Sequence, residues 1–575
     1  MNHNSKFSLI GWSDCLPMPT FFLAIVFSLF QTGLGGGQLY ASQKKFAQTK
    51  GSQWSDCLEW SIENPSFVGN PFDVEAKVEF THRQTGRSIA TPMFYDGRDI
   101  WRFRFTGILT GRWSFETFSE DEDLNGWAGE IIIDKNEDPK AHGFIKAFGN
   151  KWGWQGTEEA FVPQYVMGKD IEVFYDAAQR RLDKAKIERD ITEFIDEHGF
   201  TGFHFQVRGR WFDLEGHTKG KTNPDFRTYQ VLETLIQTVH ARGGACHLWM
   251  WGKDQKRGGD GPRAILGEPL NEADRRNLRY LAARLGPLPG WSIGYGYDTE
   301  NLWASPEELT AWKDFLESHF GWDHFIGARV GFDEKGTYGR YGKGIPKAPL
   351  NEKFNAPVGD RYTAWLGGDY IGYTSYRPLY DRYVEVLEHQ PGKPSFDEDR
   401  FRIRDAAQWT HKDYDAELTC KGLWHSAMAG GVANIWGHLL PDSDQGGSQS
   451  YDSGDVHIKH RIKTYATFFR DKGRFRNHFI RDNRLADPRT GSTEKSEPAE
   501  ISVCLRSAFR THYIFYKENG SSVGMNLTGM VGPQRAVAVD ARSRYKEIDL
   551  GMLSADKHTW QAPYKSDWAI AVGDF

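Results

Sequence analysis

The stretch WSIGYGYDTENLW, residues Trp291–Trp303, shows most directly how this chain folds. Its first half is rich in aromatic, β-branched and glycine residues and predicts a buried strand, which ends where the acids Asp298 and Glu300 begin. Because side chains alternate along a strand, the small residues of this stretch share one face with the acids. The pattern predicts a cavity with carboxylates on its rim.

The same alternation of strand-like and amphipathic helical segments extends from about residue 145 to 480. It predicts helices packed around a parallel sheet. Eight strands are expected, at residues 161–168, 201–209, 245–252, 291–298, 324–331, 370–376, 393–399 and 431–437. This number predicts an α/β fold with a (β/α)₈ TIM barrel. A doubly wound sheet is the alternative, but no glycine-rich dinucleotide fingerprint follows the first strand.

Shorter alternating segments flank the barrel on both sides. Residues 52–142 show a period of two that predicts an N-terminal β-sandwich, and residues 498–575 predict a smaller C-terminal β-sandwich. The polar segment RLADPRTGSTEKSEPAE, at residues 484–500, separates the second sandwich from the barrel and reads as a linker.

The N-terminal 41 residues are predicted to be a signal peptide. They contain the apolar run PTFFLAIVFSLF, residues 19–30, which is too short to span a membrane, together with the basic Lys6 and a small-residue cleavage site around Ala41. A buried strand is the alternative. The signal peptide predicts a secreted or periplasmic protein without stable membrane insertion after processing.

The composition favours a carbohydrate partner and gives no electrostatic footprint for nucleic acid or an anionic membrane. Basic residues number 71 and acidic residues 77, and their mixture along the chain offers no basic surface for nucleic acid. The 21 tryptophans exceed what an ordinary cytosolic enzyme needs, and exposed indole rings stack on sugars. The five cysteines lack metal-ligand spacing. No cofactor and no metal are expected.

Acids at the ends of two predicted strands are candidates for catalysis, because active sites of such barrels lie at the carboxyl ends of the strands. Asp298 and Glu300 end the fourth strand, and Asp397, Glu398 and Asp399 end the seventh. Two facing carboxylates suffice for glycoside hydrolysis, in which one protonates the leaving oxygen and the other attacks or activates water. The alternative is that these acids pair with nearby arginines or cap the next helix.

This arrangement resembles the large clan of retaining (β/α)₈-barrel glycoside hydrolases known as clan A. In that clan the acid/base follows strand four and the nucleophile follows strand seven. The segment LWHSAMAGGVANIWG, residues 423–437, is similar to the eighth-strand region of a bacterial branch of the clan, whose members carry an N-terminal and a C-terminal sandwich. The terminal DWAIAV, residues 567–572, resembles that branch's second sandwich.

The resemblance implies roles for individual residues. It makes Glu398 the nucleophile, since the side chains of Asp397 and Asp399 would project to the opposite face of the strand. It makes Glu300 the acid/base, with Asp298 as the alternative, because the clan commonly has Asn-Glu here and this chain has Thr-Glu. A strand-six tyrosine that contacts the nucleophile would be Tyr376 or Tyr373.

Further residues near the strand ends could bind substrate. Aromatic candidates for stacking are Trp211, Trp249, Trp251, Trp303 and Trp436, and candidates for contacts with hydroxyls are His204, His247 and His438. Basic candidates for recognising sulfate or uronate are Arg208, Arg210 and Lys253. Core packing of the tryptophans and a solvated basic loop are the alternatives. A metal at His204 and His247 lacks a third ligand.

The sequence therefore predicts an exported glycoside hydrolase that cleaves a polysaccharide or oligosaccharide with retention of configuration. The basic residues favour a sulfated or acidic algal or plant glycan. A non-catalytic carbohydrate-binding protein and a polysaccharide lyase are the alternatives, and a lyase would release an unsaturated product.

Overall fold

The computed structural model describes residues 44–55, 57–157, 159–168, 171–176, 181–213, 222–251, 270–296, 306–328, 367–373, 379–389, 392–400, 416–436, 456–475, 479–489 and 500–575. The predicted signal peptide lies outside these residues and stays a prediction. Along these ranges, no helix combines the length and the apolar character that crossing a membrane requires.

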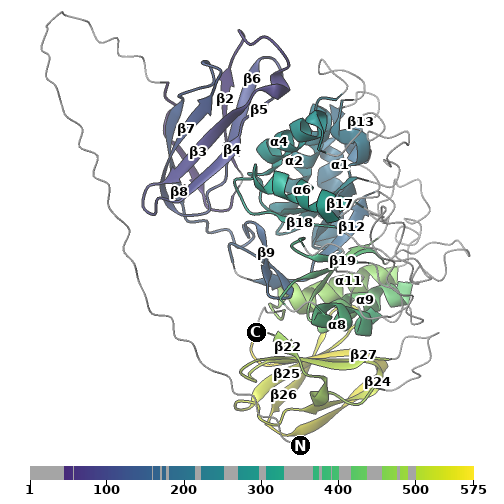
Figure 1. Cartoon of the computed structure of the whole chain (residues 1–575). Coiled ribbons are helices and arrows are strands. Elements are labelled where there is room, and N and C mark those ends of the chain that lie inside the picture. The colour runs from purple at the N-terminus through teal and green to yellow at the C-terminus, as the bar shows by residue number, and fades with distance from the viewer. Residues whose placement is uncertain are drawn as a thin grey trace, which may run out of the picture. The chain divides into compact units, whose positions relative to one another are not determined.

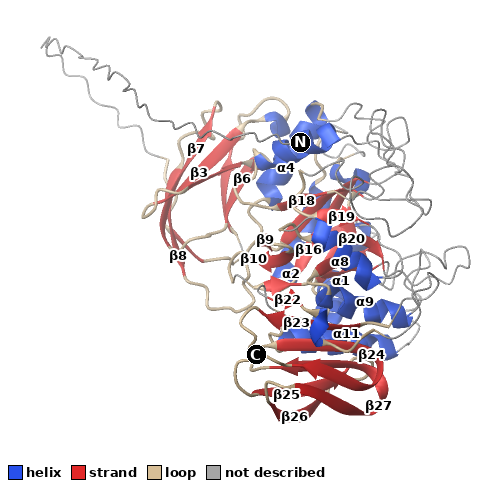
Figure 2. Cartoon of the chain, turned by 60° about the horizontal axis from the view of Figure 1, so that its bottom comes forward, coloured by secondary structure: helices blue, strands red, loops and turns tan. Residues whose placement is uncertain are grey.

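A sheet of eight parallel strands forms the centre of the fold (Figures 1 and 2). In chain order the strands are β12 (Gln164–Gly168), β15 (Gly202–Gln206), β16 (Ala245–Trp251), β17 (Trp291–Gly296), β18 (Phe325–Gly327), β19 (Ile371–Tyr373), β20 (Ser395–Arg400) and β21 (Val432–Trp436). Each falls within or overlaps one of the eight predicted strands. Neighbouring strands run in the order β18-β17-β16-β15-β12-β21-β20-β19, so the predicted barrel is confirmed as a nearly closed ring.

The ring comes together between β18 and β19, the two ends of this order. Across this seam the backbone N–H of Asp369 donates to the carbonyl of Ile326 at 2.8 Å. The N–H of Ile326 in turn donates to the Asp369 carboxylate, also at 2.8 Å. Asp369 therefore uses its backbone and its side chain to continue the hydrogen bonding where the ladder of paired strands is interrupted.

Helices cover the outer face of the barrel strands. They are α1 (Lys184–Ile191), α2 (Phe226–His240), α4 (Glu272–Leu285), α6 (Pro306–Glu317), α8 (Leu379–His389), α9 (Ala416–Met428) and α11 (Val456–Ala466). Two of them continue as π-helical segments, η3 (Thr192–Glu197) after α1 and η7 (Thr467–Asp471) after α11. Side-chain caps start several helices; for example, Asn271 accepts from the N–H of Asp274 at the start of α4. Short 3₁₀ turns are η1 (Pro71–Asp73), η2 (Ile171–Phe174), η4 (Arg208–Trp211) and η8 (Asn483–Leu485).

Two sheets precede the barrel and face each other across a shared core. One contains β1 (Thr49–Ser52), β8 (Ala128–Asp134), β7 (Gly111–Ser119), β3 (Ala76–His82) and β4 (Ser88–Pro92); the other contains β2 (Leu58–Glu63), β6 (Ile100–Phe105) and β5 (Phe94–Tyr95). Phe80 and Phe103, one from each sheet, are fully buried in this core. The alternating pattern of the sequence thus forms a β-sandwich.

A small sheet of β9 (Ile145–Phe148), β10 (Lys151–Trp154) and β11 (Ala160–Phe161) connects the sandwich to the barrel. The indole N–H of Trp152 donates to the carbonyl of Ser395 at 3.0 Å, at the start of β20. The same ring packs against Phe325 and Phe396, which lie near the amino ends of their strands. Trp152 therefore fills the amino-terminal end of the barrel. A short hairpin, β13 (Tyr175–Asp176) and β14 (Arg181–Leu182), follows β12.

The C-terminal region contains several strands around a core of its own, as the alternating pattern of the sequence predicts. Its strands form one hydrogen-bonded sheet in the order β22 (Phe479–Arg481), β23 (Ser502–Ser507), β24 (Tyr513–Asn526), β27 (Lys557–Val572), β25 (Gln534–Asp540) and β26 (Glu547–Leu553). Register shifts near Gly520 interrupt the pairing of the long strands β24 and β27, and such bulges bend a strand. One face packs on the barrel helices, where Tyr516 stacks on Trp424 with ring centroids 5.2 Å apart.

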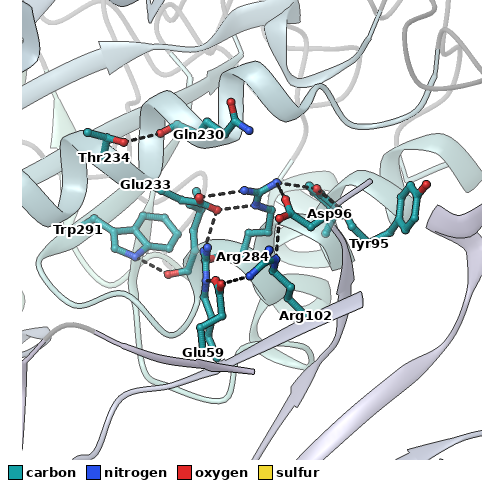
Figure 3. A network of polar contacts seen from close by, with 12 residues as sticks. Glu59, Tyr95, Asp96, Arg102, Gln230, Glu233, Thr234, Arg284 and Trp291 are labelled. Atoms are coloured by element: carbon teal, nitrogen blue, oxygen red, sulfur yellow. Dashed lines mark hydrogen bonds and ion pairs between the residues drawn. The ribbon is translucent and has the colours of Figure 1, made fainter. Parts of the chain in front are cut away.

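Buried ion pairs join the N-terminal sandwich to the barrel (Figure 3). Arg104 on β6 donates to Glu233 on α2 at 2.7 Å and to the carbonyl of Arg284 on α4 at 2.8 Å. Arg284 makes a two-pronged contact with Glu233, and its guanidinium also lies 3.3 Å from Asp96 of the sandwich. Both guanidinium groups lie 4.9 Å from the ring centre of Phe94. The carboxylate of Glu233 is thus shared by two buried cations, and Glu59 and Asp96 of the sandwich add a second negative charge to each.

Replacing Glu233 by Gln should destabilise the protein by about 3–5 kcal/mol. The buried guanidinium groups of Arg104 and Arg284 lose the carboxylate that they share, and only the more exposed Glu59 and Asp96 remain beside them. Burial by itself raises the pKa of Glu233, but Arg104 and Arg284 outweigh it and lower that pKa to about 2. The stabilisation is therefore complete above the ordinary value of 4.5 and is lost as the pH falls toward 2. Thermal unfolding between pH 7 and 2 measures both effects.

The matched control is Glu130→Gln, which removes an exposed carboxylate paired with Arg83 at 2.6 Å. An exposed pair contributes about 0–1 kcal/mol, so this variant should unfold almost as the unmodified chain does. Equal effects of the two substitutions would contradict a special role of the buried network.

Candidate functional site

Strand alternation sorts the barrel side chains into an inner and an outer set. On β15, Phe203 and Phe205 lie in the hydrophobic core shared with the helices, whereas His204 contacts His247 and Trp249 inside the ring. On β20, Phe396 packs inside the ring. The expected polar face of β15 therefore points into the barrel, as the period of two predicts.

Glu398 on β20 is a fully buried carboxylate inside the barrel, with 0% of its surface exposed. The indole N–H of Trp249 on β16 donates to Glu398 Oε2 at 2.9 Å. Its neighbour Asp397 faces the other way, where its Oδ2 lies 3.1 Å from the hydroxyl of Tyr383 on α8. The strand thus presents Glu398, and not Asp397, to the interior, as the sequence predicted.

Tyr370 fills part of the space that the small residues of β17 had predicted to be a cavity. A Cβ atom on Gly327 would lie 2.4 Å from the phenol ring of Tyr370, and one on Gly294 would lie 3.0 Å from its hydroxyl. Burial raises the pKa of Tyr370, and the negative charge of Glu398 raises it further. The phenol therefore keeps its proton beside the carboxylate. Glycine on β17 and β18 is required because the tyrosine ring lies over the backbone.

Two histidines lie side by side deeper in the barrel. His204 and His247 are both fully buried, and their ring centroids are 5.5 Å apart. His247 Nδ1 lies 2.9 Å from the hydroxyl of Ser292 on β17. Burial lowers the pKa of His247 to about 3, so its ring is neutral near pH 7. Within the described ranges, no three His, Cys, Asp or Glu side chains come together as metal ligands do.

The tryptophans proposed for stacking have different environments. Trp249 points into the barrel, but Trp211, Trp251 and Trp436 belong to the core between strands and helices and are at most 2% exposed. The indole N–H of Trp436 donates to Gln164 at 2.7 Å, and that of Trp211 donates to the carbonyl of Met250 at 2.9 Å. These three rings pack as core residues, the alternative that the sequence had left open. Their large apolar surface explains the burial.

Several predicted site residues lie outside the described residues, and their roles stay predictions. They are Asp298, Glu300, Trp303, Lys253, Tyr376 and His438. The expected separation of Glu300 and Glu398 is untested for the same reason. Arg208 and Arg210 belong to the turn η4, directly after β15, and Arg210 is exposed. The carbonyl of Arg210 accepts from the hydroxyl of Thr228 at 2.6 Å, which ties this turn to α2.

Two tyrosines inside the barrel, Tyr370 and Tyr165, were not among the residues predicted from the sequence. Tyr370 precedes β19 by one residue, and the predicted tyrosine of this strand was Tyr376 or Tyr373. Tyr165 on β12 is fully buried inside the ring and lies 6.0 Å from His247 between ring centroids. The parity of the strands could have indicated both, because each shares a face with other inward residues.

Comparison with known proteins supports the fold. A family model described as a domain of unknown function, DUF5060, matches residues 51–120. The amino-acid sequence matches no curated protein. A solved structure of a candidate glycoside hydrolase from Bacteroides vulgatus is similar with a TM-score of 0.64 at 13% identity, over 92% of this chain and 100% of that one. A family 5 glycoside hydrolase from the same organism is similar with a TM-score of 0.53 at 14% identity, over 77% and 95% of the two chains.

The close contact between Tyr370 and Gly327 predicts that a side chain at position 327 would destabilise the protein. Gly327→Ala should lower the free energy of unfolding by about 1–3 kcal/mol, because the added methyl group overlaps a ring that has no room to move. In the double variant with Tyr370→Ala the overlap disappears, so the two effects should be less than additive. Urea unfolding of the two single variants and the double variant checks this. Full additivity would show that the tyrosine does not lie over this glycine in solution.

Proposed function

We propose that this protein is a glycoside hydrolase that cleaves a polysaccharide or oligosaccharide with retention of configuration. The observation that carries the proposal is the placement of Glu398: a fully buried carboxylate on the seventh barrel strand, held by the indole of Trp249 at 2.9 Å. Burying a carboxylate in a barrel costs free energy, and functional sites are where such costs are found. The fold that this chain shares with glycoside hydrolases supports the same reaction.

In the proposed mechanism Glu398 attacks the anomeric carbon, and Glu300 gives a proton to the leaving glycosidic oxygen. This breaks the glycosidic bond and forms a glycosyl ester on Glu398. Glu300 then takes a proton from a water molecule, whose oxygen displaces the ester and restores the configuration. Trp249 keeps one carboxylate oxygen of Glu398 in place. Asp298 is the alternative acid, because it ends the same strand.

Substituting Gln for either Glu398 or Glu300 should lower turnover by several orders of magnitude while the chain still folds, because each carboxylate is required in both steps. Glu188→Gln, which removes an exposed carboxylate paired with Arg242, should leave turnover unchanged. Release of reducing ends from a panel of plant and algal polysaccharides measures the reaction. Azide should rescue Glu398→Ala and yield a glycosyl azide of inverted configuration.

Three outcomes would contradict the proposed roles or the proposed function. Full activity of Glu300→Gln with inactive Asp298→Asn would move the acid role to Asp298. An unsaturated product that absorbs in the near ultraviolet would indicate a lyase. Binding of glycans without any cleavage by the unmodified chain would indicate a carbohydrate-binding protein.

The proposed substrate class is a sulfated or acidic glycan. Exposed Arg210 and its neighbour Arg208 follow the second barrel strand, where a guanidinium group can bind sulfate or carboxylate by two hydrogen bonds. Replacing both arginines by Ala should weaken cleavage of a sulfated glycan more than cleavage of its desulfated form. Steady-state kinetics on the two substrates gives the comparison. Equal losses on both would mean that the arginines only support the turn η4.

The proposed site of action is outside the cytoplasm, after removal of residues 1–41. The apolar run at residues 19–30 and the cleavage site around Ala41 support this location. Mass spectrometry of protein recovered from the periplasm or medium of an expressing cell should find the first residue close to Ser42. An intact Met1 in an exclusively cytoplasmic protein would contradict export.

A further inference from the structure

A cavity lies at the opposite end of the barrel from Glu398. Its volume is about 410 Å³, within the range of small-molecule sites of roughly 300–1,000 Å³. Val162 and Thr201, which line it, lie two residues before β12 and one residue before β15, so the cavity lies at the amino ends of the strands. No part of the proposed hydrolytic mechanism uses this face of the barrel.

Two π-helical segments end at this cavity. Gly199, two residues after η3, and Gly473, two residues after η7, both line it. Both glycines have positive φ angles, +84° and +60°, which allow the chain to turn away from each segment. π-Helical turns are rare and often occur at functional sites. The backbone therefore departs from regular helix on two sides of the same cavity.

Aromatic rings form much of the wall. Phe161 on β11 stacks on Trp154 with ring centroids 4.6 Å apart and planes 11° apart. The ring of His142 lies almost parallel to the same indole, at 5.1 Å. Phe161 and Phe475 are partly exposed, whereas Trp154 is only 3% exposed. The partly exposed rings of Phe161 and Phe475 suit the C–H faces of a sugar ring, which also needs hydrogen-bonding groups at its edge, while buried Trp154 supports Phe161.

The polar groups of the lining balance in charge. Glu159 and Arg470 are exposed and of opposite sign. Arg470 also donates to Asp471 at 2.9 Å, and this carboxylate partly neutralises the charge of the guanidinium group. Burial lowers the pKa of His142 to about 4, so this ring is neutral near pH 7. The wall offers hydrogen-bond donors and acceptors beside apolar rings, but no net charge to attract an ion.

We infer that this cavity is a second carbohydrate-binding site, which takes a short uncharged saccharide. An apolar ligand would make no use of the hydrogen-bonding groups of Glu159 and Arg470, and an anionic ligand would lie near the Glu159 carboxylate. The site goes beyond the proposed hydrolysis and does not depend on it.

Isothermal titration calorimetry on the whole chain with Glu398→Gln tests the site without hydrolysis. The probes are cellotetraose, xylotetraose, mannotetraose, laminaritetraose and maltotetraose, with tetragalacturonate and octanoate as the charged and apolar comparisons. At least one neutral tetrasaccharide should bind, and Phe161→Ala or Arg470→Gln should weaken that binding about five- to tenfold. Arg470→Gln changes an exposed side chain, so it tests the site even where Phe161→Ala unfolds.

The matched controls are Phe118→Ala and Arg83→Gln, which remove a partly exposed phenylalanine and an exposed arginine from the N-terminal sandwich. Both should leave the affinity unchanged. The site is refuted if no neutral tetrasaccharide binds, if the cavity variants bind as the controls do, or if octanoate or tetragalacturonate binds there instead. Cleavage by the unmodified chain is measured separately, so failure of the proposed hydrolysis and failure of this site give different results.

Discussion

The inward and outward alternation of side chains on the barrel strands is the constraint on which the candidate site depends. Each strand is covered on both faces, by the helices outside and by other strands inside. On β20 this alternation sends Phe396 and Glu398 inward and Asp397 toward α8. A shift of one residue in register would exchange the two acids. The contact between Asp397 and Tyr383 opposes such a shift, because the shift would separate the two residues and leave the buried Asp397 carboxylate without this partner.

The barrel interior is apolar at one end of its axis and contains polar groups toward the other end. Near the amino ends of the strands it is filled by Trp152, Phe325 and Phe396, which pack as an apolar layer. Toward the carboxyl ends it contains Glu398 and Trp249 joined by a hydrogen bond. The apolar layer closes the amino-terminal end of the barrel, and the polar layer lies on its carboxyl-terminal side. This places the candidate chemistry at the end where barrels of this architecture have their active sites.

The N-terminal sandwich is attached through buried ion pairs, whereas the barrel core consists mainly of packed apolar side chains. Arg104 contributes a cation that would be costly to bury alone. Glu233 pairs with both Arg104 and Arg284, and the sandwich adds Glu59 at Arg104 and Asp96 at Arg284. These groups favour the observed docking of the sandwich, because separating the two parts would take from Arg104 and Arg284 one of the carboxylates that pair with them. The C-terminal sheet instead packs through large rings, such as Tyr516 on Trp424, and through the buried pair of His425 and Glu518 at 2.8 Å.

Local patterns in the sequence were enough to predict the eight barrel strands, the N-terminal sandwich and the inward direction of Glu398. All of these follow from strand periodicity, which a short segment carries by itself. The tertiary structure alone decided that Tyr370 lies over Gly327, that Trp251 and Trp436 pack outward, and that the C-terminal strands form one sheet. It alone brought Arg104 to Glu233, 129 residues away. Such contacts depend on how the ring closes and which surfaces meet, and no local pattern records the distance between segments far apart in the chain.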